Sequence, residues 1–217
     1  MFTGIVQALL PIQSVTDEPN LRRLSIDLGN ELAEGLELGA SVAINGVCLT
    51  LSELTGPIAQ FDIIHETLAL TNLGSLALGS RVNVERSFTV GAEVGGHIVS
   101  GHVSCSVPVV DIKTDRNRRD LSFELPADWG RFILLKGYAA IDGASLTISE
   151  LNQEAARFGV SLIPETIERT TLGQVEIGDR VNLEVDSQTQ AIVTTVERMA
   201  ASGQLQALLA NPDSQRH

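Results

Sequence analysis

The sequence predicts a mainly β protein made of two homologous modules, each folded as a small closed barrel, with a C-terminal helix after them. Three observations support this: an internal repeat, short strand-like runs that recur in both halves, and a tail without a counterpart in the first half. The chain has 217 residues, 43% of them hydrophobic, which suffices for one large or two small cores. Aromatic residues make up only 4%, so Val, Ile, Leu and Ala must form most of these cores.

The internal repeat is long and keeps its register. Residues 42–54 align with residues 139–151 at an offset of 97, and eight of the thirteen positions are identical. The same offset pairs residues 2–6 with 99–103. After an insertion of two residues, an offset of 99 pairs 79–85 with 178–184. Chance does not maintain a register over this length, so we predict two homologous domains, residues 1–97 and 98–186.

Each module contains short alternating or β-branched runs separated by Gly, Asn, Asp and Pro, which is typical of strands. Asn45-Gly46 and Asp142-Gly143 each predict a two-residue hairpin, because both central residues of a type I′ turn need a positive φ. Several short strands in fewer than ~100 residues favour a closed barrel, which has no exposed edge. The predicted strands are 41–44, 48–54, 58–64, 81–86, 138–141, 145–151, 157–163 and 180–185; short helices are predicted at 30–35, at 127–135 and after Glu66 and Glu165.

The tail, residues 187–210, has few strand signals. An apolar stripe at helical spacing runs through it, formed by Ala191, Ile192, Thr195, Val196 and Met199. Two interpretations stay open: the helix packs on its own barrel, or it associates with the same helix of other chains.

Charge and composition argue against several classes of partner. The net charge of −12 disfavours nucleic acid and anionic membranes. No apolar stretch approaches the ~20 residues of a membrane span, and the N-terminus lacks the basic region of a signal peptide. Two cysteines without CxxC or HxxxH spacing disfavour a disulfide framework and a zinc site. This cysteine usage predicts a cytoplasmic location.

Six motifs follow one another along the chain: residues 1–6, 45–50, 95–103, 136–137, 141–147 and 163–166. The ordered set is specific, and it resembles the riboflavin synthase (alpha chain) family over essentially the whole length. The resemblance implies two six-stranded antiparallel Greek-key barrels in tandem, each binding a lumazine, and a homotrimer formed through the helix at 187–210.

The resemblance also implies an enzyme that needs no cofactor. Two molecules of 6,7-dimethyl-8-ribityllumazine would give riboflavin and 5-amino-6-ribitylaminouracil by transfer of four carbons. The site would lie between the N-terminal barrel of one subunit and the C-terminal barrel of its neighbour. Because one molecule donates and its twin accepts, the difference in role should lie where matched positions differ. These pairs are Cys48/Ser145, Ile5/His102, Phe2/Val99, Ser41/Tyr138 and Asn45/Asp142.

Three side chains are candidates for the chemistry. The substrate ring itself accepts electrons, as a cofactor does elsewhere. The protein must therefore stack two rings, which contributes roughly 7–11 kcal/mol, and supply acid–base groups. His102 is the acid–base candidate, since histidine changes charge near neutral pH; otherwise it is a hydrogen-bonded histidine at the barrel mouth. Cys48 is the nucleophile or positions a water; otherwise it is a small buried apolar residue. Ser41 would polarise or anchor nearby.

The resemblance further implies ligand contacts, which we group by module. The first module would supply Phe2, Gly4, Ile5, Val6, Cys48, Leu49, Thr50, Asp62, Ile63, Ile64, His65, Glu66 and Thr67. The second would supply Gly101, His102, Val103, Lys136, Ser145, Leu146, Thr147, Ile163, Pro164, Glu165, Thr166, Ile167 and Glu168. Lys136 would otherwise be a solvated charge. His65 replaces the proline of the second module, which leaves the loop shape there open, and His97 is expected only to cap or turn the linker.

Two other functions compete with the enzyme. A lumazine- or flavin-binding antenna protein would use the same barrels without catalysis, but such relatives degrade the second-barrel motif, which is intact here. A flavin-dependent oxidoreductase would need a nicotinamide domain, and no GxGxxG unit is present.

Overall fold

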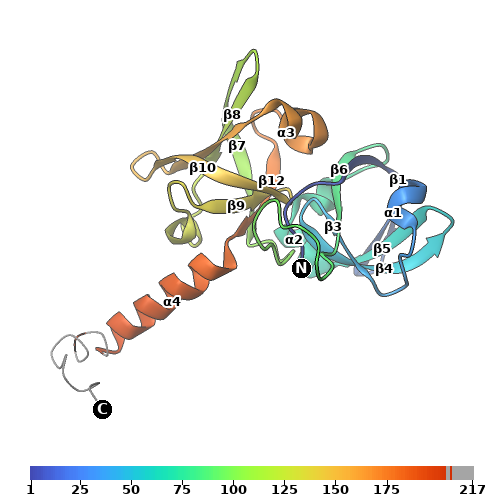
Figure 1. Cartoon of the computed structure of the whole chain (residues 1–217), viewed down its shortest axis with the longest axis horizontal. Helices are drawn as coiled ribbons and strands as arrows, with labels where there is room; N and C mark the ends of the chain where they lie inside the picture. The colour runs from blue at the N-terminus through green and yellow to red at the C-terminus, as the bar shows by residue number, and fades with distance from the viewer. Residues whose placement is uncertain (204–205, 207–217) are drawn as a thin grey trace.

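The computed structural model describes residues 1–203 and 206, and it contains two closed six-stranded antiparallel barrels followed by a helix (Figure 1). This confirms the predicted fold class. The first barrel has the closed order β1-β2-β5-β4-β3-β6, and the second repeats it with β7 to β12. The strands of the first barrel are β1 (Ala8–Glu18), β2 (Leu21–Asp27), β3 (Ser41–Ile44), β4 (Val47–Thr55), β5 (Ile58–Ile64) and β6 (Arg81–Arg86). Those of the second are β7 (Cys105–Asp115), β8 (Arg118–Glu124), β9 (Tyr138–Ile141), β10 (Ala144–Asn152), β11 (Arg157–Leu162) and β12 (Arg180–Val185).

The helices are short except for the last. They are α1 (Gly29–Ala33), α2 (His65–Leu70), α3 (Pro164–Arg169) and α4 (Ser187–Ala201), with 3-10 turns η1 (Asn72–Ser75), η2 (Gly130–Phe132) and η3 (Thr171–Gly173). The predicted helix at 127–135 is wrong, since only η2 forms there. Pro126 has no N–H group, and Gly130 is a poor helix former. The Pro126 carbonyl accepts from the N–H groups of Trp129 and Gly130, and this leaves room for a single turn.

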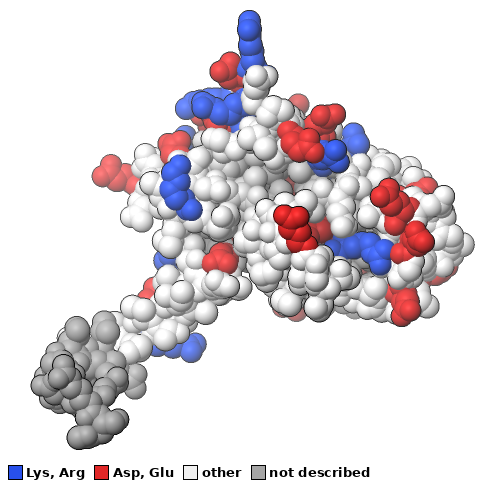
Figure 2. Space-filling view, in the orientation of Figure 1, with Lys and Arg blue, Asp and Glu red and all other residues white. Residues whose placement is uncertain are grey.

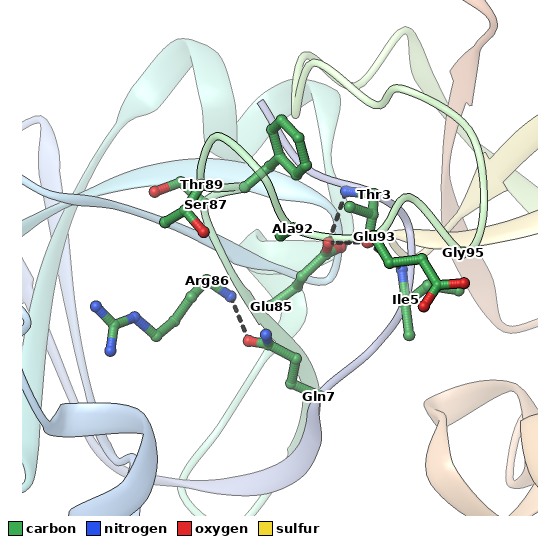
Figure 3. A pocket seen from close by; sticks show the side chains of 11 residues that line it. Thr3, Ile5, Gln7, Glu85, Arg86, Ser87, Thr89, Ala92, Glu93 and Gly95 are labelled. Carbon is green, nitrogen blue, oxygen red and sulfur yellow. Dashed lines mark hydrogen bonds between the residues drawn. The ribbon is translucent and has the colours of Figure 1, made fainter.

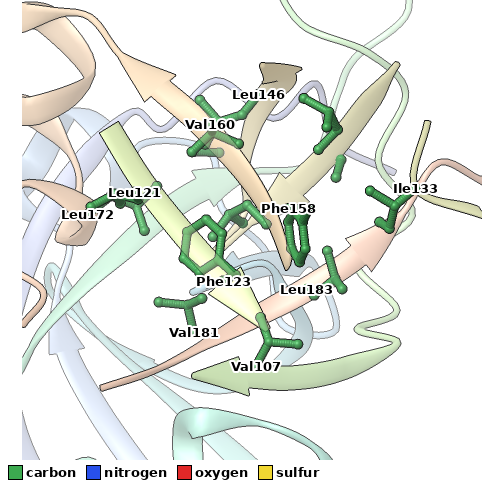
Figure 4. Packing of buried hydrophobic residues seen from close by; sticks show 14 of the residues in the cluster. Val107, Leu121, Phe123, Ile133, Leu146, Phe158, Val160, Leu172, Val181 and Leu183 are labelled. Carbon is green, nitrogen blue, oxygen red and sulfur yellow. The ribbon is translucent and has the colours of Figure 1, made fainter. Parts of the chain in front are cut away.

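Each barrel encloses its own apolar core. In the second barrel the Phe123 and Phe158 rings lie 5.2 Å apart at the centre, surrounded by aliphatic side chains from all six strands (Figure 4). In β10 the inward residues Leu146 and Ile148 are buried, whereas Thr147 between them is exposed. This period of two is what closes a barrel around a dry centre and leaves the alternate residues outside it.

The two barrels meet at their repeated hairpins. Both residues of each turn have positive φ, 45° and 78° at Asn45 and Gly46, 45° and 80° at Asp142 and Gly143, as predicted for type I′ turns. A Cβ on Gly46 would lie 2.6 Å from the Gly143 nitrogen, so the turns can touch only because both second residues are glycine.

Polar side chains are exchanged across this contact. Asn83 Nδ2 donates to the Asp142 carbonyl at 2.8 Å, and Asn182 Nδ2 donates to the Asn45 carbonyl at 2.9 Å. The hydrogen bonds therefore follow the repeat, and they fix one barrel against the other.

Asp142 makes this contact sensitive to pH. Its carboxylate accepts from the Asn182 N–H at 2.7 Å, from Asn72 Nδ2 at 3.0 Å and from Thr171 Oγ1 at 3.1 Å. Burial raises the pKa of Asp142 from its ordinary 3.8 to about 7, although these hydrogen bonds oppose the shift. Between pH ~4 and pH ~7, Asp142 therefore keeps its proton in the folded chain and releases it in the unfolded chain. The contribution to stability is full below pH ~4 and is lost as the pH rises to about 7, at about 1.4 kcal/mol per pKa unit.

We expect Asp142→Asn to remove this pH dependence, because asparagine already occupies the matched position 45 and carries no titrating proton. Chemical unfolding of both proteins at pH 4 and pH 7 measures it. The free-energy difference between variant and wild type should shift in favour of the variant as the pH rises. A difference that stays constant between the two pH values would contradict the assignment.

Helix α4 extends away from both barrels (Figure 1). Val193 packs against the core of the second barrel, and Arg131 pairs with Glu197 at 3.5 Å. In contrast, Ile192 is 64% exposed and Val196 50% exposed. Packing on its own barrel, one of the two interpretations of the stripe, therefore does not hold for these two residues. Few charged side chains lie along α4 in Figure 2. The predicted stretch 204–205 and 207–210 lies outside the described residues.

Among the helices of the described part of the chain, none combines the length and the apolar character needed to cross a membrane.

Candidate functional site

A pocket of about 300 Å³ opens at one edge of the second barrel. Strand β10 pairs with β9 over Ala144–Thr147, but with β11 only from Ile148 onward. Strands β10 and β11 diverge at this point, and the edge of β10 that faces β11 forms one wall of the pocket. The lining residues are Gly4, Ile5, Val6, Ala144, Ser145, Leu146, Ile163, Glu165, Thr166, Arg169 and Thr170. A small-molecule site usually has this size and such a mixture of apolar walls and a few polar groups.

The N-terminal segment of the chain completes this pocket. The Gly4 carbonyl accepts from the Ser145 N–H at 2.8 Å, and Val6 packs against the core of the second barrel. Gly4 has φ 73°, and a Cβ there would lie 2.5 Å from Ser145 Cβ. Grouping Gly4, Ile5 and Val6 with the first barrel is therefore wrong: these residues line the pocket of the second.

The segment between the barrels makes the reciprocal contact. The Gly101 carbonyl accepts from the Cys48 N–H at 2.9 Å, and Val103 packs against the core of the first barrel. Grouping Gly101, His102 and Val103 with the second barrel is wrong for the same reason. Because the segments are exchanged, the backbone next to His102 lies against the strand of Cys48, although the two residues lie in different modules of the sequence.

Ser41 lies on the same face as Cys48. In the β3–β4 pair, Ser41 is opposite Thr50 and Ala43 is opposite Cys48. Residues two apart on a strand share a face, so Ser41, Cys48 and Thr50 project from one surface of the barrel. The inward residues Val47, Leu49 and Leu51 of β4 are buried, which places that shared surface outside the barrel.

Other predicted contacts are spread around these sites. Ile63 is buried in the first core, Asp62 pairs with Arg23 at 2.6 Å, and Ile64, His65 and Glu66 are exposed where α2 begins. Thr67 is half-buried on α2, as is Ile167 on α3. Lys136, Thr147, Pro164, Ile167 and Glu168 do not line the pocket of the second barrel. Their ligand contacts stay predictions.

Phe2 lies elsewhere than expected. It is fully buried in a small cluster between the barrels with Ala43, Val99 and Ala140, and its backbone bridges Val99. A Cβ on Gly101 would lie 2.8 Å from Phe2 Cε2. Phe2 therefore holds the two exchanged segments side by side, and a direct contact with ligand stays a prediction.

His97 is expected only to cap or turn the linker, but its ring lies beside Ser145, which lines the pocket of the second barrel. Its Nδ1 is 2.6 Å from Ser145 Oγ, and its ring stacks on Tyr138 with centroids 5.3 Å apart. Burial lowers the pKa of His97, with Asp186 opposing the shift, so the neutral ring is favoured. The linker has no counterpart in the repeat, and this is why the comparison of modules gave no signal for His97.

Arg169 is a second residue that the sequence did not reveal. It lines the pocket and pairs with Glu165 at 2.5 Å, one helical turn before it. The offset of 99 places Leu70 at the matched position of the first module, so the two modules differ in charge at this position. Ala144 and Thr170 complete the residues that were missed.

A further hollow of about 330 Å³ adjoins this pocket and shares Ile5 with it. It lies between the segment 3–7, the end of β6 and the linker (Figure 3). Glu85 projects into it toward Thr3, and the Gln7 side chain accepts from the Arg86 N–H at 2.8 Å.

Comparison with known proteins agrees with this architecture. The lumazine binding domain matches residues 3–87 and again 100–186. Riboflavin synthase of Escherichia coli (strain K12) is 48% identical over 203 residues, covering 93% of this chain and 94% of the relative. Riboflavin synthase of Mycobacterium tuberculosis (strain CDC 1551 / Oshkosh) is 42% identical over 205 residues, covering 93% and 99%.

Solved structures with the same fold include LumP complexed with riboflavin, with a TM-score of 0.80, and LumP complexed with 6,7-dimethyl-8-(1'-D-ribityl) lumazine, with a TM-score of 0.77. Both are 26% identical and cover 86% of this chain and 100% of their own. The resemblance of the ordered motifs is thereby confirmed. The chain belongs to the riboflavin synthase family, enzymes that transfer a four-carbon unit, and it carries two lumazine binding domains.

Proposed function

We propose that the chain converts two molecules of 6,7-dimethyl-8-ribityllumazine into riboflavin and 5-amino-6-ribitylaminouracil. The observation that carries the proposal is the reciprocal exchange of segments, Gly4–Val6 into the second barrel and Gly101–Val103 into the first. It builds the two barrels in the same way, so that each can bind one copy of the substrate, which is what a reaction between two copies of one molecule requires. The matched positions differ chemically, which can assign the two copies different roles.

Incubating the purified protein with the lumazine alone, without cofactor, tests this. Flavin absorbance should appear, with one riboflavin for every two lumazines consumed. The competing function is a non-catalytic lumazine- or flavin-binding antenna protein; the LumP structures hold riboflavin or the lumazine, but at 26% identity they are less similar in sequence than the riboflavin synthases at 48% and 42%. Bound lumazine without flavin formation would move the assignment to the antenna protein.

The proposed roles follow the geometry of the first site. Cys48 acts as the nucleophile or positions a water, His102 transfers the proton, and Ser41 anchors the ligand on the shared face. The Gly101–Cys48 hydrogen bond supports this grouping, since it brings the backbone beside His102 to the strand of Cys48.

Because serine already occupies the matched position 145, exchanging the two side chains tests the role of Cys48. We expect Cys48→Ser to lower kcat by at least about tenfold, because serine is a weaker nucleophile, and Ser145→Cys to change it much less. Steady-state kinetics of the two variants measures this. Equal losses would contradict the assignment of the nucleophile to the first barrel.

We further propose that the reacting pair forms between the N-terminal barrel of one subunit and the C-terminal barrel of its neighbour in a cytoplasmic homotrimer, with domains 1–97, 98–186 and a trimerisation helix 187–210. The exposed side chains of Ile192 and Val196 support this, because α4 projects from the barrels with this stripe uncovered. Heterologous contacts of this kind close into a ring.

Substituting one residue of the stripe tests the trimer. Ile192→Asp should yield a smaller species by light scattering, because a charge would be buried in the helix contact. Ser187→Asp, exposed on the first turn and on the opposite face of α4 from Val196, is the matched control and should leave the wild-type mass. A trimer that persists in Ile192→Asp, or after truncation behind Asp186, would contradict the role of α4.

A further inference from the structure

Two buried glutamates occupy equivalent positions in the barrels. Glu85 on β6 and Glu184 on β12 are each 5% exposed. They stand opposite Ala43 and Ala140 on the neighbouring strands. Within residues 1–203, neither makes a salt bridge with an Arg or Lys side chain. A carboxylate without a cationic partner is costly to bury, so its hydrogen bonds must explain why it is there.

Each glutamate binds the start of one exchanged segment through three hydrogen bonds. Glu85 accepts from the Thr3 N–H at 2.6 Å, from Thr3 Oγ1 at 2.7 Å and from the Gly4 N–H at 3.1 Å. Glu184 accepts from the Ser100 N–H and Oγ, both at 2.7 Å, and from the Gly101 N–H at 3.0 Å. Figure 3 shows the first of these clamps. A carboxylate can accept all three, because both of its oxygens are acceptors.

In each clamp the hydroxyl group of Thr3 or Ser100 forms a second hydrogen bond, to the backbone two residues further along the chain. Ser100 Oγ donates to Glu184 and accepts from the His102 N–H at 3.1 Å. Thr3 Oγ1 likewise donates to Glu85 and accepts from the Ile5 N–H at 3.3 Å. A continuous path of hydrogen bonds therefore runs from each glutamate to the residue that enters the opposite barrel's site.

We propose that Glu184 and Glu85 are positioning residues that act across the modules. Glu184 of the second barrel, through Ser100, sets His102 at the site of the first barrel. Glu85 of the first barrel, through Thr3, sets Ile5 in the pocket of the second. The same hydrogen-bonded clamp thus positions His102, a side chain that can transfer a proton, at the first site and Ile5, an apolar side chain, at the second. The inference rests on the proposed function, since it assigns His102 a role in the reaction.

Glutamine substitutions separate the two clamps. Glutamine keeps the shape, but its amide nitrogen would face the glycine N–H, donor against donor. Misplacing a reacting group by about 1 Å costs up to ~10²-fold in rate, so Glu184→Gln should lower kcat about 10–100-fold with riboflavin affinity changed less than about threefold. Glu85→Gln loosens Gly4 and Ile5, which line the second pocket, and leaves the segment of His102 in place. It should raise KM while kcat stays within about threefold.

The chain itself offers the rescue variant, because the first module has threonine where the second has Ser100. Ser100→Ala should reproduce the loss in Glu184→Gln, and Ser100→Thr should restore most of the wild-type kcat. If Glu184→Gln does not fold, as judged by circular dichroism, the two variants Ser100→Ala and Ser100→Thr test the proposal alone. Wild-type kcat in folded Glu184→Gln or in Ser100→Ala would overturn the proposal. Equal effects of Glu85→Gln and Glu184→Gln on kcat and KM would also overturn it, because they indicate a purely structural role.

These outcomes are distinguishable from failure of the proposed function, which shows as absence of flavin formation in the wild type. In that case riboflavin affinity becomes the measurement. The clamps then predict weaker riboflavin binding in Glu85→Gln, whose segment lines the second pocket, and a change of less than about threefold in Glu184→Gln; unchanged affinity in Glu85→Gln would overturn them.

Discussion

Replacing His102 by glutamine should lower kcat for flavin formation by about 10²–10⁴-fold, which is what a placed acid–base group contributes. Glutamine still forms hydrogen bonds but cannot carry the proton between the twin substrates. His102 is exposed in a segment that Glu184 ties to the second barrel and the Gly101–Cys48 hydrogen bond ties to the first, so the substitution disturbs little packing. Riboflavin affinity should therefore stay within a few-fold of the wild type.

His102→Ile provides the matched variant, because isoleucine occupies the equivalent position 5 of the first module. It should show the same loss of kcat as the glutamine variant. Turnover at the wild-type rate in either variant would remove His102 from the chemistry. Single-turnover measurements with lumazine separate this effect from slow release of product.

Adding one methyl group at Gly101 should abolish the site of the first barrel. The Cβ of Gly101→Ala would lie 2.6 Å from Cys48 Cβ and 2.8 Å from Phe2 Cε2, and the backbone there has φ 85°. The segment must move, which breaks the hydrogen bond to the Cys48 N–H. We expect loss of flavin formation by more than about 10²-fold, because both reacting side chains lose their placement. Unfolding free energy should fall by roughly 2–5 kcal/mol from overpacking and the strained φ.

Gly79→Ala separates the clash from the backbone strain. Gly79 has φ 82°, but nothing lies within 4 Å of the position that its Cβ would take. It should lose about 1–2 kcal/mol of stability from the positive φ alone and keep the wild-type kcat. Gly4→Ala, with a Cβ 2.5 Å from Ser145 Cβ, should instead damage the second pocket. Wild-type turnover in Gly101→Ala would contradict the exchanged arrangement.

The sequence predicted the strands that carry the clearest turn signals. Asn45-Gly46 and Asp142-Gly143 located β3, β4, β9 and β10 within one residue, because only a few residue types tolerate positive φ. It did not locate β1, β2, β7 and β8. These strands contain charged residues, and β1 and β7 each contain a proline. In the second half of β1, residues 13–18, most side chains are exposed. They are held by their neighbours in the closed barrel rather than by their own apolar pattern.

The sequence predicted which residues form the candidate sites, but not which barrel each of the two glycine segments contacts. The repeat shows that Gly4 matches Gly101 and that Cys48 matches Ser145, but an alignment of modules carries no information about which barrel a segment contacts. Each glycine segment precedes the first strand of its own barrel, and only the folded chain shows that it crosses to the other. His97 and Arg169 were missed for a related reason: His97 lies in the linker, which the repeat does not cover, and Arg169 is matched by Leu70, so no residue shared by the modules marks either position.

The number of ligand sites per chain tests the central claim most directly. Equilibrium titration of the purified wild type with riboflavin, followed by the fluorescence of free and bound flavin, counts them. Two sites of unequal affinity per chain are predicted, with Gly101→Ala and Gly4→Ala each removing a different one. Saturation at one riboflavin per chain in the wild type, or loss of the same site in both variants, would contradict an arrangement in which each module completes the site of the other.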